Sequence, residues 1–328
     1  MNEAQARGLF FEIVVKRLLE ASGYLLVQSG GIKGRGEIHQ IDAYGRFHFQ
    51  VPFVYPIRLI AEAKWYKTGV RLGSIRDFVG VVKDISENYF VEQGLPEQQF
   101  KELLERRYTD CGAIFSATSF SLPAQHYAYA HCIFMIPFQG IKILEEVRHV
   151  IERIIQREER RFKMGMYENL EEGESKSTYR KIAEEICNRN EELMGSLERI
   201  GSYLGLLDGI YPVHMISTEK LDFSDPLKPD LYEISSIEKE YMRNLGFSVL
   251  FSFKDRKGTT IQFTMPTYII QSMFRVTRSL QRNLFEYIDT PVQIRRQEET
   301  YRRIFQLKIS NQDRERIFSN LRSFRILQ

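Results

Sequence analysis

Segments with helical periodicity alternate with short apolar segments of strand character from residue 5 to residue 138, and that alternation limits the folds open to this chain. Residues 5–22 carry a wide apolar helical face, and Gly23 is placed to end that helix. A hairpin follows at 38–49, with its turn near Ala43–Arg46. This order of elements predicts an α/β sandwich. The expected elements are a helix at 5–22, a strand at 24–29, the hairpin at 38–49, a strand at 58–66, a helix at 74–90, a strand at 112–120, a helix at 122–132 and a strand at 133–138.

The rest of the chain has longer helical segments and less regular alternation. We expect a first domain at 1–155 and a second domain, 156–328, of α+β type led by long helices. The expected elements are a helical insertion at 91–109, a helix at 141–163, a polar linker at 164–178, a long helix at 177–207, short strands with a helix near 234–245 within 211–270, and mainly helices over the last fifty or so residues.

Composition excludes several classes of protein. The 328 residues have a net charge of +3 and three cysteines without a CxxC pair, which argues against a disulfide framework or a structural zinc site. No signal peptide and no run of 18 apolar residues is present, so we expect a soluble, cytoplasmic protein with no membrane partner. Lys and Arg outnumber Asp and Glu two to one in 272–328, which suits a phosphate-rich ligand.

The most informative residues are Asp42 in one expected strand and Glu62 and Lys64 in another. Period-two alternation sends Glu62 and Lys64 to the same face of an otherwise apolar strand, LIAEAKWY. Burying such charges is unfavourable unless they pair or bind something. Hydrolysis of a phosphodiester uses carboxylates that hold Mg²⁺ and a cation beside the attacking water or the developing charge. Taken alone, Glu-x-Lys is more often a solvated salt bridge on an exposed strand, but the apolar context favours a site.

Residues 5–145 resemble the PD-(D/E)XK nuclease superfamily, and most closely its Mrr-type restriction endonuclease branch. The resemblance lies in the segments GLFFEIVVKRLLEASGY, GRGEIHQIDAYG, IAEAKWY and GAIFSATSFSLPAQHYAYAHCIFMIPF. It implies a restriction-endonuclease-like αβββαβ core with a mixed central sheet. It also implies that Asp42, Glu62 and the backbone carbonyl of Ala63 bind the metal, that Lys64 assists the water, and that Glu12 completes the site. Ile41 stands where the family pattern has proline.

Three further residues are candidates for contact with nucleic acid. Lys33 and Arg35 lie in a glycine-rich segment near the site and are candidates for DNA phosphate contacts, although solvated loop charges would look the same. Alternation places Gln40 on the face of Asp42. His39 is more typical of a hydrogen-bonded structural histidine.

These patterns together indicate a Mg²⁺-dependent DNA endonuclease, with Mn²⁺ able to substitute. The family resemblance implies a role in restriction or antiviral defence, with a partner protein of such a system. Two alternatives stay open: a nuclease of the same fold that acts on RNA or on branched DNA in repair, and an idle nucleic-acid-binding or assembly module. An apolar stripe along 178–207 is equally consistent with packing inside the chain and with a homodimer, which double-strand cleavage favours.

Overall fold

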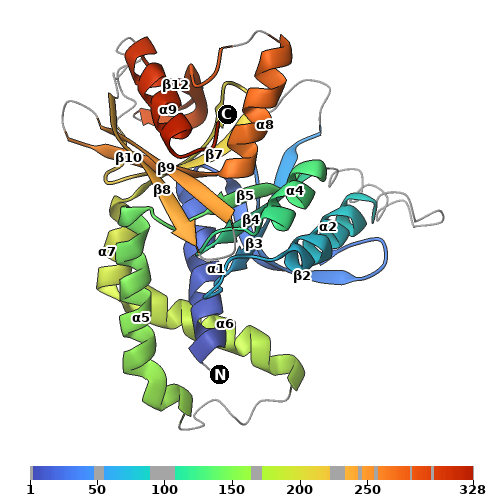
Figure 1. Ribbon diagram of the computed structural model, residues 1–328. Helices are drawn as coiled ribbons and strands as arrows, with labels where there is room; N and C mark the ends of the chain where they lie inside the picture. Colours follow the sequence, from blue (N-terminus) through green and yellow to red (C-terminus); the bar gives the residue numbers. More distant parts are fainter. Residues whose placement is uncertain are drawn as a thin grey trace.

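The computed structural model describes residues 3–47, 55–88, 108–163, 172–221, 233–242, 246–254, 258–280, 283–296 and 299–327. Two β-sheets and the helices that pack on them make up these residues (Figure 1). Nearly all of the helical insertion expected at 91–109, and the first part of the linker expected at 164–178, lie outside the described residues.

The first sheet has five strands in the order β1-β2-β3-β4-β5. Strand β2 pairs antiparallel with both β1 and β3, whereas β3-β4 and β4-β5 are parallel. The sheet is therefore mixed, and the expected α/β class is confirmed. The strands are β1 (Leu25–Lys33), β2 (Ile38–Arg46), β3 (Ile57–Lys64), β4 (Thr109–Ser116) and β5 (Phe134–Pro137).

Helices cover both faces of this sheet. Helix α1 (Glu3–Ala21) shares one apolar core with the inward side chains of β3, while α2 (Leu72–Ser86) and α4 (Leu122–Ala130) share another on the opposite face. As the sequence predicted, Gly23 terminates the helix: it follows the last residue of α1, Ala21, by two positions, has a φ of 83° and donates its N–H to the carbonyl of Glu20.

Within the segment expected to form a hairpin at 38–49, residues 38–46 form a single strand, β2, which pairs with β1, and residues 48 and 49 lie outside the described residues. The chain turns earlier, where the Gly34 amide donates to the carbonyl of Glu37 at 2.7 Å. Gly45 looked like a turn residue, but it is a site of close packing: a Cβ there would lie 3.2 Å from the Cβ of Tyr24 and 3.1 Å from a methyl of Val27. The turn prediction at Ala43–Arg46 was therefore wrong.

The second sheet has seven strands in the order β12-β11-β6-β7-β10-β9-β8, and every neighbouring pair is antiparallel. Helices α8 (Thr267–Leu280) and α9 (Asn311–Ser323) pack on it (Figure 1). The strands are β6 (Gly201–Leu207), β7 (Tyr211–Ser217), β8 (Glu233–Met242), β9 (Gly246–Lys254), β10 (Thr260–Pro266), β11 (Tyr287–Arg296) and β12 (Glu299–Lys308).

Two helical predictions in this half were wrong. Of the helix expected near 234–245, the described residues, 234–242, belong to the edge strand β8, where charged residues are tolerated because one side of the strand has no strand neighbour in the sheet. The helices expected across 287–308 are the hairpin β11–β12. Pro291, inside β11, was a signal against a helix, since proline removes a helical hydrogen bond.

The long helix expected at 177–207 is also wrong, because the segment forms three elements. They are α6 (Glu172–Arg189), α7 (Glu191–Arg199) and then β6. Asn190 separates the helices: its backbone is extended, and its side chain caps α7 by accepting the Leu193 amide at 2.9 Å. The apolar stripe packs on α1 and on α5 (Lys142–Lys163) within the same chain, so it is not a free surface for a partner.

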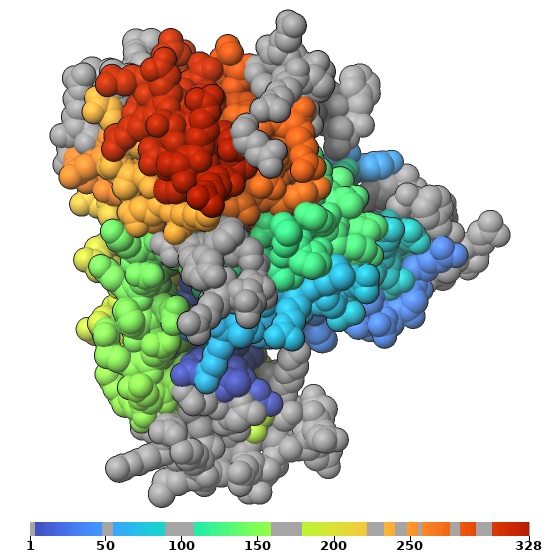
Figure 2. Space-filling view, in the orientation of Figure 1, coloured from blue at the N-terminus to red at the C-terminus, as the bar shows by residue number. Residues whose placement is uncertain are grey.

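The two sheets are joined by shared core and by polar contacts. One apolar core runs from α1 through α5, α6 and α7 to residues of the second sheet, including Ile216 and Leu250. The Tyr268 amide, at the start of α8, donates to Gln125 of α4 at 3.2 Å. In the space-filling view the C-terminal segments, orange and red, rest directly on the green segments of the first half (Figure 2). A domain boundary near residue 155 stays a prediction.

Candidate active site

The site is built where strands β2 and β3 stop pairing. Their ladder runs from Arg46 opposite Arg58 to Ala43 opposite Ala61, and Asp42 is the next residue of β2. At that position a side chain replaces the backbone carbonyl as the hydrogen-bond acceptor: Asp42 Oδ2 accepts the N–H of Ala63 at 2.9 Å. In an extended strand the N–H and C=O of one residue point to the same edge. The Ala63 carbonyl therefore lies on the edge of β3 that Asp42 faces.

Glu62 and Lys64 stand on either side of Ala63 in β3. Their side chains form an ion pair in which the Lys64 ammonium donates to a Glu62 carboxylate oxygen. The two side chains are only 20% and 25% exposed, so this is not the freely solvated pair that Glu-x-Lys usually makes. Parallel pairing with β4 on the far edge, from Ile57 to Lys64, holds this part of the strand in place.

Two more charged groups reach Asp42 from helices. Glu12 comes from α1, as the family resemblance implied, and its carboxylate accepts a hydrogen bond from Arg180 of α6. Arg180 also lies 3.8 Å from Asp42 Oδ1. All three side chains are between 12% and 17% exposed. The structure thus brings Glu12, Asp42, Lys64 and Arg180 together, and Glu62 joins them through Lys64.

Arg180 is the residue that sequence reasoning missed. It lies 168 residues after Glu12, in a charged helix whose composition resembles many solvated helices. Only the packing of α6 against α1 carries it to the site.

The Asp42 carboxyl is in an environment that disfavours its charge. Burial, followed by the nearby negative charge of Glu12, raises its pKa to about 6 from the ordinary 3.8. The hydrogen bond from Ala63 and the charges of Lys64 and Arg180 act in the opposite direction but do not cancel the rise. Two carboxylates that repel each other in a sparsely solvated place are typical of a cation site.

Lys64 keeps its proton in this setting. Burial alone would lower its pKa, but the charge of Glu62, the hydrogen bond to Glu62 and the charge of Asp42 together hold the pKa above the ordinary 10.5. Lys64 is therefore a cation at neutral pH. Its chemistry here is that of a positive charge and a hydrogen-bond donor, and not that of a general base.

The oxygen ligands of the site suit a hard cation with few protein ligands. Within the described residues, no group of three or more His, Cys, Asp and Glu side chains is close enough to hold a metal ion. Magnesium does not need such a group, because it keeps several waters and commonly uses one or two carboxylates. Asp42, with the Ala63 carbonyl on the same edge, Glu12 near it and Glu62 in the adjacent strand, meets that requirement.

The candidate nucleic-acid contacts lie along the β1–β2 hairpin. Gln40 is exposed two residues before Asp42, whereas Lys33 and Arg35 are exposed at the tip. Lys33 pairs with Ile38, so by strand geometry it lies roughly 13 Å along β2 from Asp42. The tip is therefore outside the cluster around Asp42 but on the same hairpin.

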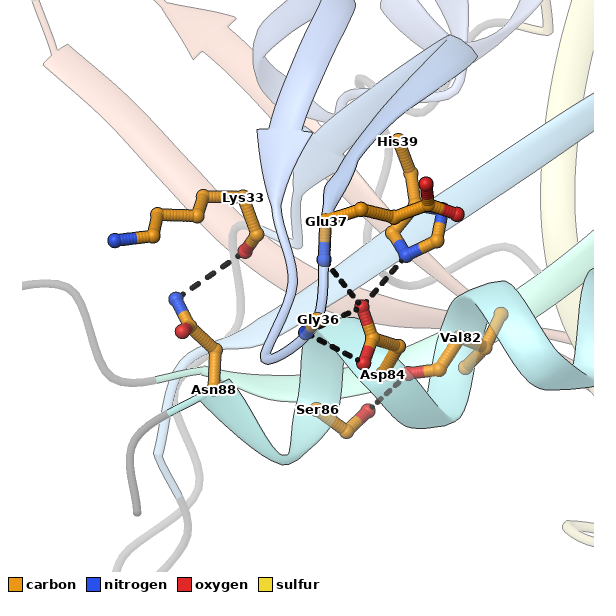
Figure 3. Close-up of polar contacts among 8 residues, drawn as sticks. All are labelled: Lys33, Gly36, Glu37, His39, Val82, Asp84, Ser86 and Asn88. Atoms are coloured by element: carbon orange, nitrogen blue, oxygen red, sulfur yellow. Dashed lines mark hydrogen bonds and ion pairs between the residues drawn. The ribbon is translucent and has the colours of Figure 1, made fainter. Parts of the chain in front are cut away.

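Asp84 of α2 fixes the tip of this hairpin (Figure 3). Its carboxylate accepts the Gly36 amide at 2.9 Å and lies 2.7 Å from Nε2 of His39. The hydrogen bond with His39 is the main reason why the pKa of Asp84 is lowered. A Cβ on Gly34 would come within 2.0 Å of Asp84, so the close approach requires glycine. His39 is thus a structural residue, as expected.

Comparisons with known proteins add little to this picture. No protein-family model matches the chain, and no curated protein sequence matches it. A crystal structure of a protein of unknown function, AF1548, matches with a TM-score of 0.31 and 16% identity over 57% of this chain and 98% of that chain. A TM-score this low carries no argument. Among the described helices, none has the length and apolar character needed to span a membrane.

Proposed function

We propose that this chain is a metal-dependent endonuclease of the PD-(D/E)XK type that hydrolyses phosphodiester bonds of DNA. The observation that carries the proposal is the position of Asp42 at the end of the β2–β3 ladder, with Ala63, Lys64 and Glu12 around it. The order α1-β1-β2-β3-α2-β4 and the mixed sheet support the restriction-endonuclease-like core that the sequence resemblance implies.

The charges around Asp42 suit a bound magnesium ion. Asp42, the Ala63 carbonyl and a carboxylate from Glu62 or Glu12 are the groups that would hold it. The ion would supply Lewis acidity toward the scissile phosphate and a water of lowered pKa. The repulsion between Asp42 and Glu12 supports this assignment, because a divalent ion would relieve it.

The part of Lys64 follows from its protonation. As a half-buried cation beside the carboxylates, it would orient the attacking water or stabilise the negative charge that develops on the phosphate. Glu62 positions the ammonium through their ion pair. Removing either charge should therefore affect the rate far more than the fold.

DNA is the substrate we favour, and the hairpin is the reason. Lys33, Arg35 and Gln40 are exposed along it, where a duplex that reaches the site at Asp42 would extend past them. A role in restriction or antiviral defence rests on the family resemblance alone. Double-strand cleavage would still favour a homodimer, but a surface other than the 178–207 stripe would have to form it.

The test is cleavage by the purified full chain with Mg²⁺ or Mn²⁺ on supercoiled, linear and single-stranded DNA and on RNA. We expect cleavage of DNA, and we expect Lys64→Ala to lower its rate at least about 100-fold while the chain stays folded, which circular dichroism would show. Lys83→Ala, which removes an exposed lysine of α2, is the matched control and should cleave as the wild type does.

Each other outcome selects a different function. Cleavage of RNA in preference to DNA would change the substrate class. Binding to nucleic acid without cleavage would indicate an idle module. If Lys64→Ala cleaves as fast as the Lys83→Ala control, the active site lies elsewhere.

A further inference from the structure

Arg180 is a cation shared by two carboxylates of the candidate site. Its guanidinium donates a hydrogen bond to Glu12 and lies 3.8 Å from Asp42 Oδ1. Only 17% of its side chain is exposed. At such distances and with so little water, a charge acts strongly on whatever binds the same oxygen atoms.

The position of Arg180 is set by the packing of α6. Ala183 and Cys187 lie three and seven residues after it, on the same helix face, and both are completely buried in the core around α1. Two polar contacts at the rim also join the helices: Lys16 lies 3.8 Å from Glu184, and Arg17 donates to Asn188 at 3.1 Å. Arg180 is therefore delivered to the site by a fixed helix.

An ion pair that serves only to tie α6 to α1 would not need to be here. The buried apolar face and the two rim contacts already join these helices. Arg180 instead reaches past the helix interface to a strand residue, Asp42. A divalent ion held by Asp42 would meet a guanidinium less than 4 Å from one of its ligand oxygens.

We propose that Arg180 competes with the divalent ion for Asp42 and Glu12, so that binding of the ion displaces the guanidinium and loosens α6 around Arg180, where the helix has not yet reached Ala183 and the rim contacts. This inference rests on the proposed metal-dependent function and adds a link between the metal site and a helix beyond residue 155. The arginine lowers metal affinity, and the helix that carries it responds to the occupancy of the site.

The experiment measures metal binding to the full chain without nucleic acid. Calorimetry with Ca²⁺ and Mg²⁺ gives the affinity. Fluorescence gives a second readout, because Trp65 is the single tryptophan, follows Lys64 directly and packs edge-on against Phe11 beside Glu12. We expect Arg180→Gln to bind both ions about tenfold more tightly than the wild type. Arg180→Lys keeps the charge and should stay close to the wild-type affinity.

The matched control is Arg17→Gln, which removes another arginine contact between α1 and α6 without changing a charge at the site. It should bind the ions as the wild type does. Hydrogen exchange on the wild type tests the helix directly and does not depend on how a variant folds: adding Mg²⁺ should speed exchange of the α6 amides close to Arg180 several-fold.

Failure of this inference is distinct from failure of the proposed function. If the wild type binds metal and Arg180→Gln binds it no more tightly, or if α6 exchange does not change, the competition is wrong and the metal site stands. If neither protein binds Ca²⁺ or Mg²⁺ at millimolar concentration, the metal-dependent function is wrong, and this inference fails with it.

Discussion

In the five-stranded sheet the half-buried polar groups at the end of the β2–β3 ladder are charged, whereas the buried polar groups described in the strands of the seven-stranded sheet are neutral. Asp42, Glu62 and Lys64 represent the first kind. His214 and Gln262 represent the second, and they bond to serine hydroxyls at 2.7 and 3.0 Å. Buried charge is unfavourable unless it is paired or used. The contrast supports the proposal that the charges at the end of the β2–β3 ladder serve chemistry, while the neutral polar groups of the second sheet hold structure.

The largest expected effect is the loss of cleavage when one charge is removed from the first sheet. Glu62→Gln keeps the shape but ends the ion pair that positions Lys64, so the cleavage rate should fall at least about 100-fold. Because Glu62 is only 20% exposed, loss of the ion pair should lower the melting temperature, but the chain should stay folded, which circular dichroism would show. Glu20→Gln, on the rim of α1, is the control and should leave the rate unchanged. If Glu62→Gln cleaves as fast as the wild type, the charges at the end of the β2–β3 ladder are not needed for cleavage.

The next effect concerns acid stability and belongs to the second sheet. His214 is fully buried, and burial lowers its pKa to about 3 from the ordinary 6.5. Below pH 6.5 the His214 imidazole therefore binds a proton in the unfolded chain, whereas in the folded chain it stays neutral until the pH approaches 3. This residue therefore leaves the free energy of unfolding unchanged above pH 6.5. Between pH 6.5 and 3 it lowers that free energy by about 1.4 kcal/mol per pH unit.

His214→Leu should flatten that acid dependence. Nδ1 of His214 has no hydrogen-bond partner in the described part of the chain, and Ser202 keeps its contact with Ser22 at 2.9 Å, so the variant loses little at neutral pH. Melting curves from pH 7.5 to 4.5 give the slopes. His149→Asn, at an exposed position, should keep the wild-type slope. Equal slopes for His214→Leu and the wild type would show that this histidine is not the acid-sensitive group.

A smaller effect of opposite sign is expected at Asp42. Its pKa of about 6 in the folded chain lies above the ordinary value, so folding favours the protonated form. That stabilisation is complete below pH 3.8 and is lost as the pH rises through about 6. Asp42→Asn avoids the loss and should be more stable than the wild type at pH 8, on the order of 1 kcal/mol, with the difference shrinking toward pH 4.

Melting curves in EDTA measure this difference without any bound metal. Asp77→Asn, at an exposed position of α2, should show no such pH-dependent gain. A wild type that is the more stable protein at pH 8 would contradict the view that the charge of Asp42 is kept at the expense of stability.

The smallest effect is local and tests whether the hairpin is held as described. Asp84→Ala removes the acceptor for the Gly36 and Glu37 amides and for His39. Hydrogen exchange at the hairpin tip should accelerate several-fold, while exchange in β3 and β4 stays the same. Asp77→Ala on the same helix is the control. Unchanged exchange at the tip would mean that Asp84 does not fix the hairpin.

The elements that follow from a local residue pattern could be predicted from the sequence. The helical face of α1, the glycine that ends it and the strand LIAEAKWY were all predictable from periodicity, and so was the shared face of Glu62 and Lys64. The placement of Asp42 in a strand was correct, although the hairpin around it was not, because Gly45 packs beneath β1 instead of turning the chain.

The features that could not be predicted from the sequence depend on contacts between distant parts of the chain. Strands β8, β11 and β12 have charged, helix-like composition and are extended because a neighbouring strand pairs with them. Arg180 has no local signal at all, since its role comes from a contact with a residue 168 positions earlier. Long-range contacts determine both the extended conformation of these strands and the position of Arg180, and the periodicity of the sequence does not predict such contacts.

The elements that pack on α1 come from distant parts of the chain, and this matters during synthesis. This helix is synthesised long before α6, α7 and β6, the elements that it contacts in the folded chain. At ordinary translation rates the delay is on the order of ten seconds, during which part of an apolar helix lacks its cover and is a natural target for chaperones. A nascent chain that stalls before Arg180 would hold Glu12 and Asp42 without the arginine that accompanies them in the finished protein.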